Sequence, residues 1–219
     1  TVSDTIKRLH QLEDASVSDI NYFVLTVVDC AADYRPTLLP MVGRLAEELK
    51  EKAGAALVRY GFVATGDNPG AVVLFQAYEK LDGFEKAMEV YAASDDYAKA
   101  MASGKIGIRL RNLLKVHPIP FESQATGDMK YLVLTRIASA DPLIDTISSM
   151  AGVFADAGAI TFRYGTLITG SNVGNRLLGV TYPSLAAVEK AYDALGADPR
   201  YQALLEKVDV NMRNIVRLV

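Results

Sequence analysis

Apolar residues along the chain follow two spacings, one typical of strands and one typical of helices. Residues 22–28 form an apolar, β-branched run, which predicts a strand buried on both faces. A stripe at helical spacing comes next, formed by Leu38, Val42, Leu45 and Leu49. Pro36 suits the first turn of this helix and Gly54 suits its end. The chain therefore starts its regular structure with a strand and a long helix.

The same two spacings continue to residue 116. Residues 55–64 and 71–78 are expected to form strands, joined by a glycine-bearing turn at residues 65–70. A second helical stripe is formed by Leu81, Phe84, Met88 and Tyr91. A short helix over residues 95–102 and a last strand over residues 106–116 complete the pattern. The predicted order is β-α-β-β-α-β.

This pattern then occurs a second time. At a constant shift of 104, residues 53–97 lie on residues 157–201 without a gap, and 18 of the 45 positions are identical. The first helical stripe recurs as Leu143, Ile147, Met150 and Phe154, between Pro142 and Gly158. A period of this length is that of a small domain rather than of a solenoid repeat. The chain is therefore a tandem duplication.

The duplication divides the chain into four segments. We expect a leading helix in residues 1–20, a first repeat in residues 21–117, a linker in residues 118–129 and a second repeat in residues 130–219. Prolines and turn-forming residues favour extended backbone in the linker.

Each repeat has the element order of the split βαβ, or ferredoxin-like, unit. The helices of such a unit cover one face of a four-stranded antiparallel sheet. Because the strands are apolar on both faces, the second face needs cover as well. The sequence therefore predicts an α+β fold in which two tandem ferredoxin-like repeats cover each other's open sheet face within one chain.

Composition and charge limit the classes of partner that the chain is expected to bind. Hydrophobic residues make up 50% of the chain and the formal net charge is -3, without a basic run, so no nucleic-acid partner is expected. The single cysteine, Cys30, excludes an internal disulfide and fits the cytoplasm. No segment has the apolar core of a signal peptide or of a membrane helix, so no membrane partner is expected. Since the repeats cover each other, we expect a monomer or a weak homodimer.

A stretch of the second repeat points to a family. Residues 182–191 read Tyr-Pro-Ser-Leu-Ala-Ala-Val-Glu-Lys-Ala, and Asp198, Pro199 and Tyr201 follow. This stretch resembles the dimeric α/β barrel superfamily, which includes antibiotic monooxygenase-like, EthD-like, NIPSNAP-like and stress-responsive barrel domains. The resemblance implies that the two halves pack sheet against sheet into one α/β barrel within the chain, with the helices outside. It also implies a ligand inside the barrel or between sheet and helices.

Neither a metal nor a cofactor is expected. Haem-binding proteins of this type use a histidine on a helix or strand, but neither His10 nor His117 has a counterpart in the other repeat. Neither histidine has a second ligand at metal-binding spacing. Cys30 has no neighbouring base and only Arg35 as a nearby cation, so a catalytic thiolate is not expected.

The duplicated Arg-Tyr-Gly motif, at residues 59–61 and 163–165, is the main functional candidate. An arginine inside an apolar strand is costly unless it is paired or hydrated. We expect the apolar face of each strand to meet the helices and the arginine face to line the barrel. The candidate ligand-binding residues are Arg59, Tyr60, Arg163, Tyr164, Arg111, Arg213, Tyr22 and Tyr131. Such groups suit a carboxylate or an oxyanion, or they form a structural network that locks the two sheets.

Two functions follow from these residues. The first is a small-molecule-binding α/β barrel protein, with a cofactor-independent reaction of oxygenase or isomerase type left open because no catalytic base can be named. The alternative is a non-enzymatic barrel scaffold of the stress or interaction type. A cavity inside the barrel favours the first, and a filled interior favours the second.

Overall fold

The computed structural model describes residues 20–124 and 127–219, so the leading helix expected in residues 1–20 lies outside the described residues except for Ile20. The first repeat contains β1 (Tyr22–Cys30), α2 (Arg35–Ala53), β2 (Leu57–Thr65), β3 (Val72–Tyr78), α3 (Asp82–Ala93), α4 (Asp95–Ala102) and β4 (Ile106–His117). The second contains β5 (Tyr131–Ala138), α5 (Ile144–Asp156), β6 (Thr161–Leu167), β7 (Arg176–Tyr182), α6 (Leu185–Ala197), α7 (Pro199–Leu205) and β8 (Asp209–Leu218). The predicted element order is confirmed in both repeats.

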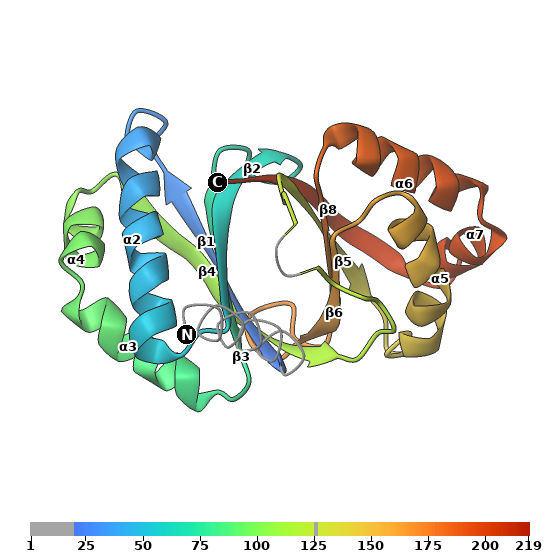
Figure 1. The fold of residues 1–219 in the computed structure, drawn as a ribbon, viewed down its shortest axis with the longest axis horizontal. Coiled ribbons are helices and arrows are strands. Elements are labelled where there is room, and N and C mark those ends of the chain that lie inside the picture. The colour runs from blue at the N-terminus through green and yellow to red at the C-terminus, as the bar shows by residue number, and fades with distance from the viewer. Residues whose placement is uncertain (1–19, 125–126) are drawn as a thin grey trace, which may run out of the picture.

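The eight strands form one closed barrel (Figure 1). Their order is β1-β3-β2-β8-β5-β7-β6-β4, and every neighbouring pair is antiparallel. Two seams join the repeats: β2 pairs with β8, and β4 pairs with β6. The predicted fold class, two ferredoxin-like repeats closed into a barrel, is confirmed.

Helices cover the outside of this barrel on two opposite sides. Helices α2, α3 and α4 pack on the first repeat, and α5, α6 and α7 pack on the second (Figure 1). Each sheet therefore has one apolar layer under its helices and another facing the barrel interior. On β1, for example, Val24 packs under the helices while Phe23 and Leu25 face the interior. This arrangement explains why the strands are apolar on both faces.

The helix boundaries agree with the sequence pattern, but the buried face of α3 differs from the predicted apolar stripe. Helix α2 ends at Gly54, which adopts a left-handed φ of 67°. The stripe predicted for α3 included Met88, whose side chain is 51% exposed. The buried face of α3 is formed instead by Ala87, Val90 and Tyr91. Ala87 is fully buried where α3 packs beside α2, and Met88, the next residue along the helix, faces solvent.

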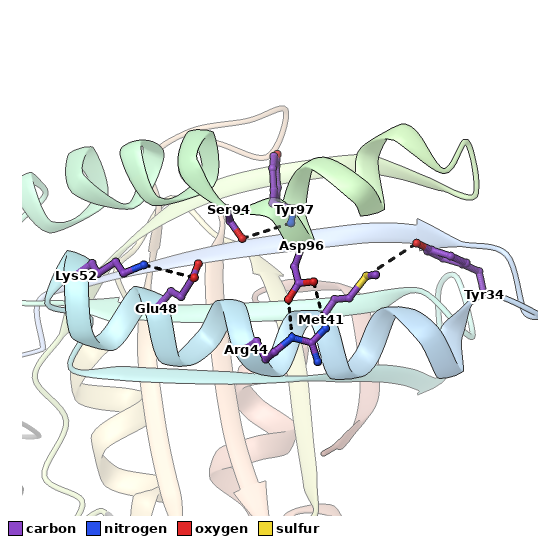
Figure 2. A network of polar contacts seen from close by, with 8 residues as sticks. All are labelled: Tyr34, Met41, Arg44, Glu48, Lys52, Ser94, Asp96 and Tyr97. Carbon is purple, nitrogen blue, oxygen red and sulfur yellow. Dashed lines mark hydrogen bonds and ion pairs between the residues drawn. The ribbon is translucent and has the colours of Figure 1, made fainter.

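Polar contacts fix the short helix α4 against α2 (Figure 2). The Ser94 hydroxyl accepts a hydrogen bond from the backbone N–H of Tyr97 at 3.4 Å, which caps the start of α4. Arg44 of α2 donates from Nε to Asp96 Oδ2 at 2.6 Å and from Nη2 to Asp96 Oδ1 at 3.1 Å. The pair joins the two helices at their exposed surface. None of the described helices is both long and apolar enough to cross a membrane.

Candidate functional site

The barrel interior contains a cavity of about 100 Å³ at one end, which we call the arginine chamber. Strands from both repeats and the segment before β5 contribute to it. Its described lining consists of Ile20, Phe23, Leu25, Leu57, Arg59, Phe75, Leu114, Gln124, Met129, Leu132, Leu134, Thr161, Arg163, Leu177, Gly179, Thr181 and Leu218. Most of this wall is apolar, which is typical of a small-molecule pocket.

Arg59 and Arg163 are the two charged residues of the described lining. Arg59 comes from β2 and Arg163 from β6, at equivalent positions of the two repeats. Burial lowers the pKa of both guanidinium groups because an apolar environment disfavours charge. No hydrogen bond or ion pair joins either side chain to another residue of the described ranges. Two positively charged side chains therefore line one cavity whose described wall carries no carboxylate.

The structure explains all three residues of the Arg-Tyr-Gly motif. The arginine faces the chamber, as the strand alternation predicts. The glycine lies at a seam: a Cβ on Gly61 would collide with the backbone carbonyl of Arg217, and a Cβ on Gly165 with that of Lys115. The close approach of two backbones thus requires glycine at both positions. The duplicated motif combines one chamber residue with one seam residue in each repeat.

The tyrosines of the motif point away from the chamber. Tyr164 is fully buried under the helices of the second repeat, and its hydroxyl donates to the carbonyl of Pro142 at 2.8 Å. Tyr60 packs under the helices of the first repeat, with its hydroxyl against Gly43 of α2. The structure therefore does not bring Tyr60 or Tyr164 to the arginines.

Arg111 and Arg213 also lie on the outer face, and the predicted orientation of β4 and β8 is wrong. The Arg111 guanidinium lies 4.5 Å from the ring centroid of Tyr91, and its Nε donates to Thr26 Oγ1 at 3.1 Å. The guanidinium of Arg213 lies 4.6 Å from the ring centroid of Tyr192. Because both faces of each sheet are apolar, the alternation cannot tell inside from outside, and the aromatic rings of the helix layer decide. The apolar side chains of these strands face the barrel instead.

Tyr22 and Tyr131 form a matching outer pair. Lys115 Nζ lies 4.3 Å from the ring centroid of Tyr22, and the Arg217 guanidinium lies 4.9 Å from that of Tyr131. Each cation is the cross-strand partner of its tyrosine. Neither tyrosine lines the arginine chamber. Of the eight predicted ligand-binding residues, the structure brings Arg59 and Arg163 together.

A second cavity of about 110 Å³ occupies the other end of the barrel, where the hairpin turns lie. Leu25, Leu134 and Leu177 line both cavities and therefore lie between them. Asn112 and Asn214 line the second cavity. The Asn214 side chain bonds to the backbone of Asp67 in the turn of the other repeat.

His117 and Cys30 lack the surroundings of reactive groups. His117 Nε2 lies 2.7 Å from Thr166 Oγ1, and burial, followed by the charges of Arg176 and Lys115, lowers the pKa of this histidine. Burial raises the pKa of the Cys30 thiol, the opposite of what a catalytic thiolate needs. Within residues 20–124 and 127–219, no three His, Cys, Asp or Glu side chains gather at metal-binding distance.

A haem held by histidine does not fit the described residues. His117 is their one histidine, and its Nε2 is engaged by a threonine hydroxyl. The cavity between the second sheet and its helices measures about 30 Å³, and its described lining contains no histidine. A histidine-bound haem therefore has no place in the function proposed below.

Among the chamber residues that sequence reasoning missed are Phe75, Thr161, Gly179 and Thr181. The signal was available in the duplication. At the shift of 104, Phe75 aligns with Gly179, while Leu57 and Ala77 align with Thr161 and Thr181. The residues of this wall are therefore found at positions where the two repeats differ, rather than at positions where they are identical.

Comparisons with known proteins agree with the fold. A family model described as Domain of unknown function (DUF6854) matches residues 20–116 and residues 129–218. No curated protein matches the chain.

Three solved structures illustrate the similarity. A protein from Fusobacterium nucleatum subsp. nucleatum, provisionally named a monooxygenase, is 11% identical with a TM-score of 0.67, and the match covers 91% of this chain and 92% of that one. Another from Lactobacillus acidophilus, with the same provisional name, is 16% identical with a TM-score of 0.57, covering 91% and 93%. A mutant chlorite dismutase from Candidatus Nitrospira defluvii, in complex with cyanide, is 8% identical with a TM-score of 0.61, covering 94% of both chains. At such identities the shared property is the fold.

Proposed function

The chain belongs to the family described as Domain of unknown function (DUF6854), and we propose that this member binds a small, largely apolar organic acid in the arginine chamber. The observation that carries the proposal is the presence of Arg59 and Arg163 in one apolar cavity. A buried positive charge is unfavourable unless an anion or hydrogen-bond acceptors accompany it. A carboxylate supplies both, since each of its oxygens accepts charge-assisted hydrogen bonds from guanidinium groups.

The chamber favours binding over acid–base catalysis. Its described lining contains no Asp, Glu, His, Cys, Lys or Tyr. A general base has to reach the substrate proton, and no described lining residue can do so near neutral pH. The fold similarity to proteins provisionally named monooxygenases is compatible with an oxygenase-type reaction. The wall of this chamber gives no residue to which a chemical step could be assigned.

The alternative, a barrel that serves only as a scaffold, calls for a filled interior. Two partly buried arginines in an interior cavity are unfavourable in a mere scaffold, because an apolar side chain would fit the apolar wall at each position without a desolvated charge. This argument supports ligand binding as the function.

Replacing each arginine by methionine tests the proposal. We expect wild-type protein to bind benzoate but not the neutral analogue benzamide, as measured by isothermal titration calorimetry. Arg59→Met and Arg163→Met should each weaken benzoate binding by about 10- to 100-fold, the value of one charge-assisted hydrogen-bonding partner. Their melting temperatures should stay unchanged or rise, because methionine fills the space without a charge.

Arg44→Met is the matched control, because it removes the same charge from the exposed surface of α2. It should leave benzoate binding unchanged. If the chamber variants lower the melting temperature and leave binding unaffected, the arginines are a structural lock and the proposal is wrong. Equal binding of benzoate and benzamide would also contradict it.

A further inference from the structure

The two walls of the arginine chamber differ although they come from equivalent strands. In the first repeat Arg59 pairs across the sheet with Phe75, and in the second repeat Arg163 pairs with Gly179. Phe75 is 8% exposed and fills its side of the barrel. Gly179 has no side chain at the corresponding position on the other side, and a Cβ there would make ordinary contacts with Leu132 and Leu134. The less bulky wall of the chamber, which we call the open wall, therefore belongs to the second repeat.

The open wall is also the polar one. Leu57 and Ala77 are cross-strand partners in the first repeat, and their counterparts Thr161 and Thr181 are partners in the second. The two threonine Oγ1 atoms lie 2.7 Å apart, and the backbone N–H of Thr161 donates to Thr181 Oγ1 at 3.1 Å. Phe75, Leu57 and Ala77 give the first repeat no side-chain hydrogen-bonding group at these positions.

One of the two hydroxyl hydrogens of Thr161 and Thr181 is not used in the contact between these side chains. Each hydroxyl carries one hydrogen, and the contact between the two oxygens uses one of them. Whichever threonine donates, the other hydroxyl hydrogen has no acceptor among the described residues. Both threonines line the chamber, so this hydrogen is available to an oxygen atom inside it.

We infer that the ligand is a compact carboxylic acid with a second oxygen group, held in a single orientation. Its acid group lies between Arg59 and Arg163, its apolar body rests on the backbone at Gly179, and its second oxygen accepts a hydrogen bond from Thr161 or Thr181. The inference rests on the proposed binding of an organic acid in this chamber. It adds the chemical class of the acid and the residues that select it.

Strand geometry places the two polar groups on one wall. Thr161 and Arg163 are two residues apart on the same face of β6, so their Cα atoms are about 7 Å apart. A hydroxyl or keto oxygen across a ring or a short chain from the carboxylate gives the ligand one group for each of these side chains. 4-Hydroxybenzoate is a suitable probe, and benzoate is the same molecule without the second oxygen.

The test compares these two acids by titration calorimetry. Wild-type protein should bind 4-hydroxybenzoate about tenfold more tightly than benzoate, the contribution of one hydrogen bond. The double variant Thr161→Val/Thr181→Val removes both hydroxyls and keeps the side-chain volume. In this variant the dissociation constants of the two acids should become about equal. Its affinity for benzoate should stay within about threefold of the wild-type value.

Gly179 tests the orientation separately. Gly179→Phe copies the residue of the first repeat and should weaken both acids by at least about 30-fold by occupying their space. Gly179→Ala is the matched control, because its Cβ would lie 3.5 Å from Leu132 Cδ1 and 3.6 Å from Leu134 Cδ2, an ordinary contact. It should fold normally and change both affinities by less than about threefold.

The outcomes separate this inference from the proposed function. Arginine-dependent binding of both acids with an unchanged ratio in the double threonine variant would overturn the selected class and leave acid binding in place. Undiminished binding in a folded Gly179→Phe protein would overturn the orientation. If Gly179→Phe does not fold, the ratio in the threonine variant still decides. Absence of binding of either acid to wild type would overturn the proposed function and this inference with it.

Discussion

The side chain of Asn214 forms two hydrogen bonds with the backbone of Asp67, an arrangement that we call the Asn214 clasp. Asn214 Oδ1 accepts from the Asp67 N–H at 2.8 Å, and Asn214 Nδ2 donates to the Asp67 carbonyl at 3.3 Å. Asn214 belongs to the last strand of the second repeat and Asp67 to the hairpin turn of the first. The bond therefore fastens one repeat to the other across the β2–β8 seam. Asn112, the counterpart of Asn214, has no side-chain hydrogen bond to a described residue.

This difference predicts unequal costs for the two asparagines. Asn214→Ala should lower the free energy of unfolding by about 1 kcal/mol, because it removes two partly buried hydrogen bonds between the last strand and the turn. Asn112→Ala removes a side chain of the same size and should cost less. Urea denaturation of both variants measures the difference. Equal costs would show that the clasp contributes nothing beyond packing.

Arg111 provides a test of which face its strand presents to the barrel. Arg111→Met should lower the free energy of unfolding by about 1 kcal/mol, because it removes the cation–π contact with Tyr91. It should leave benzoate binding unchanged, since Arg111 lies outside the arginine chamber. Urea denaturation and calorimetry on the same variant give both values. A loss of benzoate affinity comparable to that of Arg59→Met would contradict this placement.

The buried tyrosines make the protein sensitive to alkali. Burial is the largest cause that raises the pKa of Tyr78, Tyr91, Tyr164, Tyr182 and Tyr192. The unfolded chain releases these protons near pH 10, whereas the folded protein still holds them. The contribution of these tyrosines to the free energy of unfolding should therefore be constant below about pH 10 and fall above it, by up to about 1.4 kcal/mol per pH unit for each tyrosine.

Phenolate absorbance measures this titration without interference from tryptophan, because the chain contains none. The five buried tyrosines should ionise together with unfolding rather than before it. A smooth titration of all tyrosines near pH 10 in protein that keeps its circular dichroism would contradict the prediction.

Glycines at two sites should respond in opposite directions to alanine. Gly152 lies exposed within α5, and a Cβ there would meet nothing within 4 Å. Gly152→Ala should raise the free energy of unfolding by about 0.5–1 kcal/mol, because alanine favours the helix and restricts the unfolded chain. Gly104 has equal space but a φ of +66°, so Gly104→Ala should lower stability. Thermal unfolding compares the two, and a drop in melting temperature for Gly152→Ala would contradict the expectation.

Local patterns were sufficient for the elements and for part of the site. The alternation in β2 correctly placed Arg59 inside, and the apolar spacing correctly ended α2 at Gly54. The same alternation failed for Arg111, because inside and outside are equally apolar and the choice depends on Tyr91, which lies twenty residues earlier in the chain. The strand order at the seams and the clasp by Asn214 depend on contacts between distant segments. Such contacts leave no mark in a local pattern.

The closing seam has a consequence for biosynthesis. Strand β8 pairs with β2 on one side and with β5 on the other, so the barrel needs a strand that the ribosome makes after all the others. Before β6 and β8 are made, β4 and β2 of the newly made first repeat have unpaired edges, and the apolar face containing Phe23, Leu25 and Phe75 has no cover from the second repeat. The β2 edge stays unpaired until β8, the last strand of the barrel, has been translated. During that interval we expect the exposed sheet of the nascent chain to associate with chaperones or with other nascent copies.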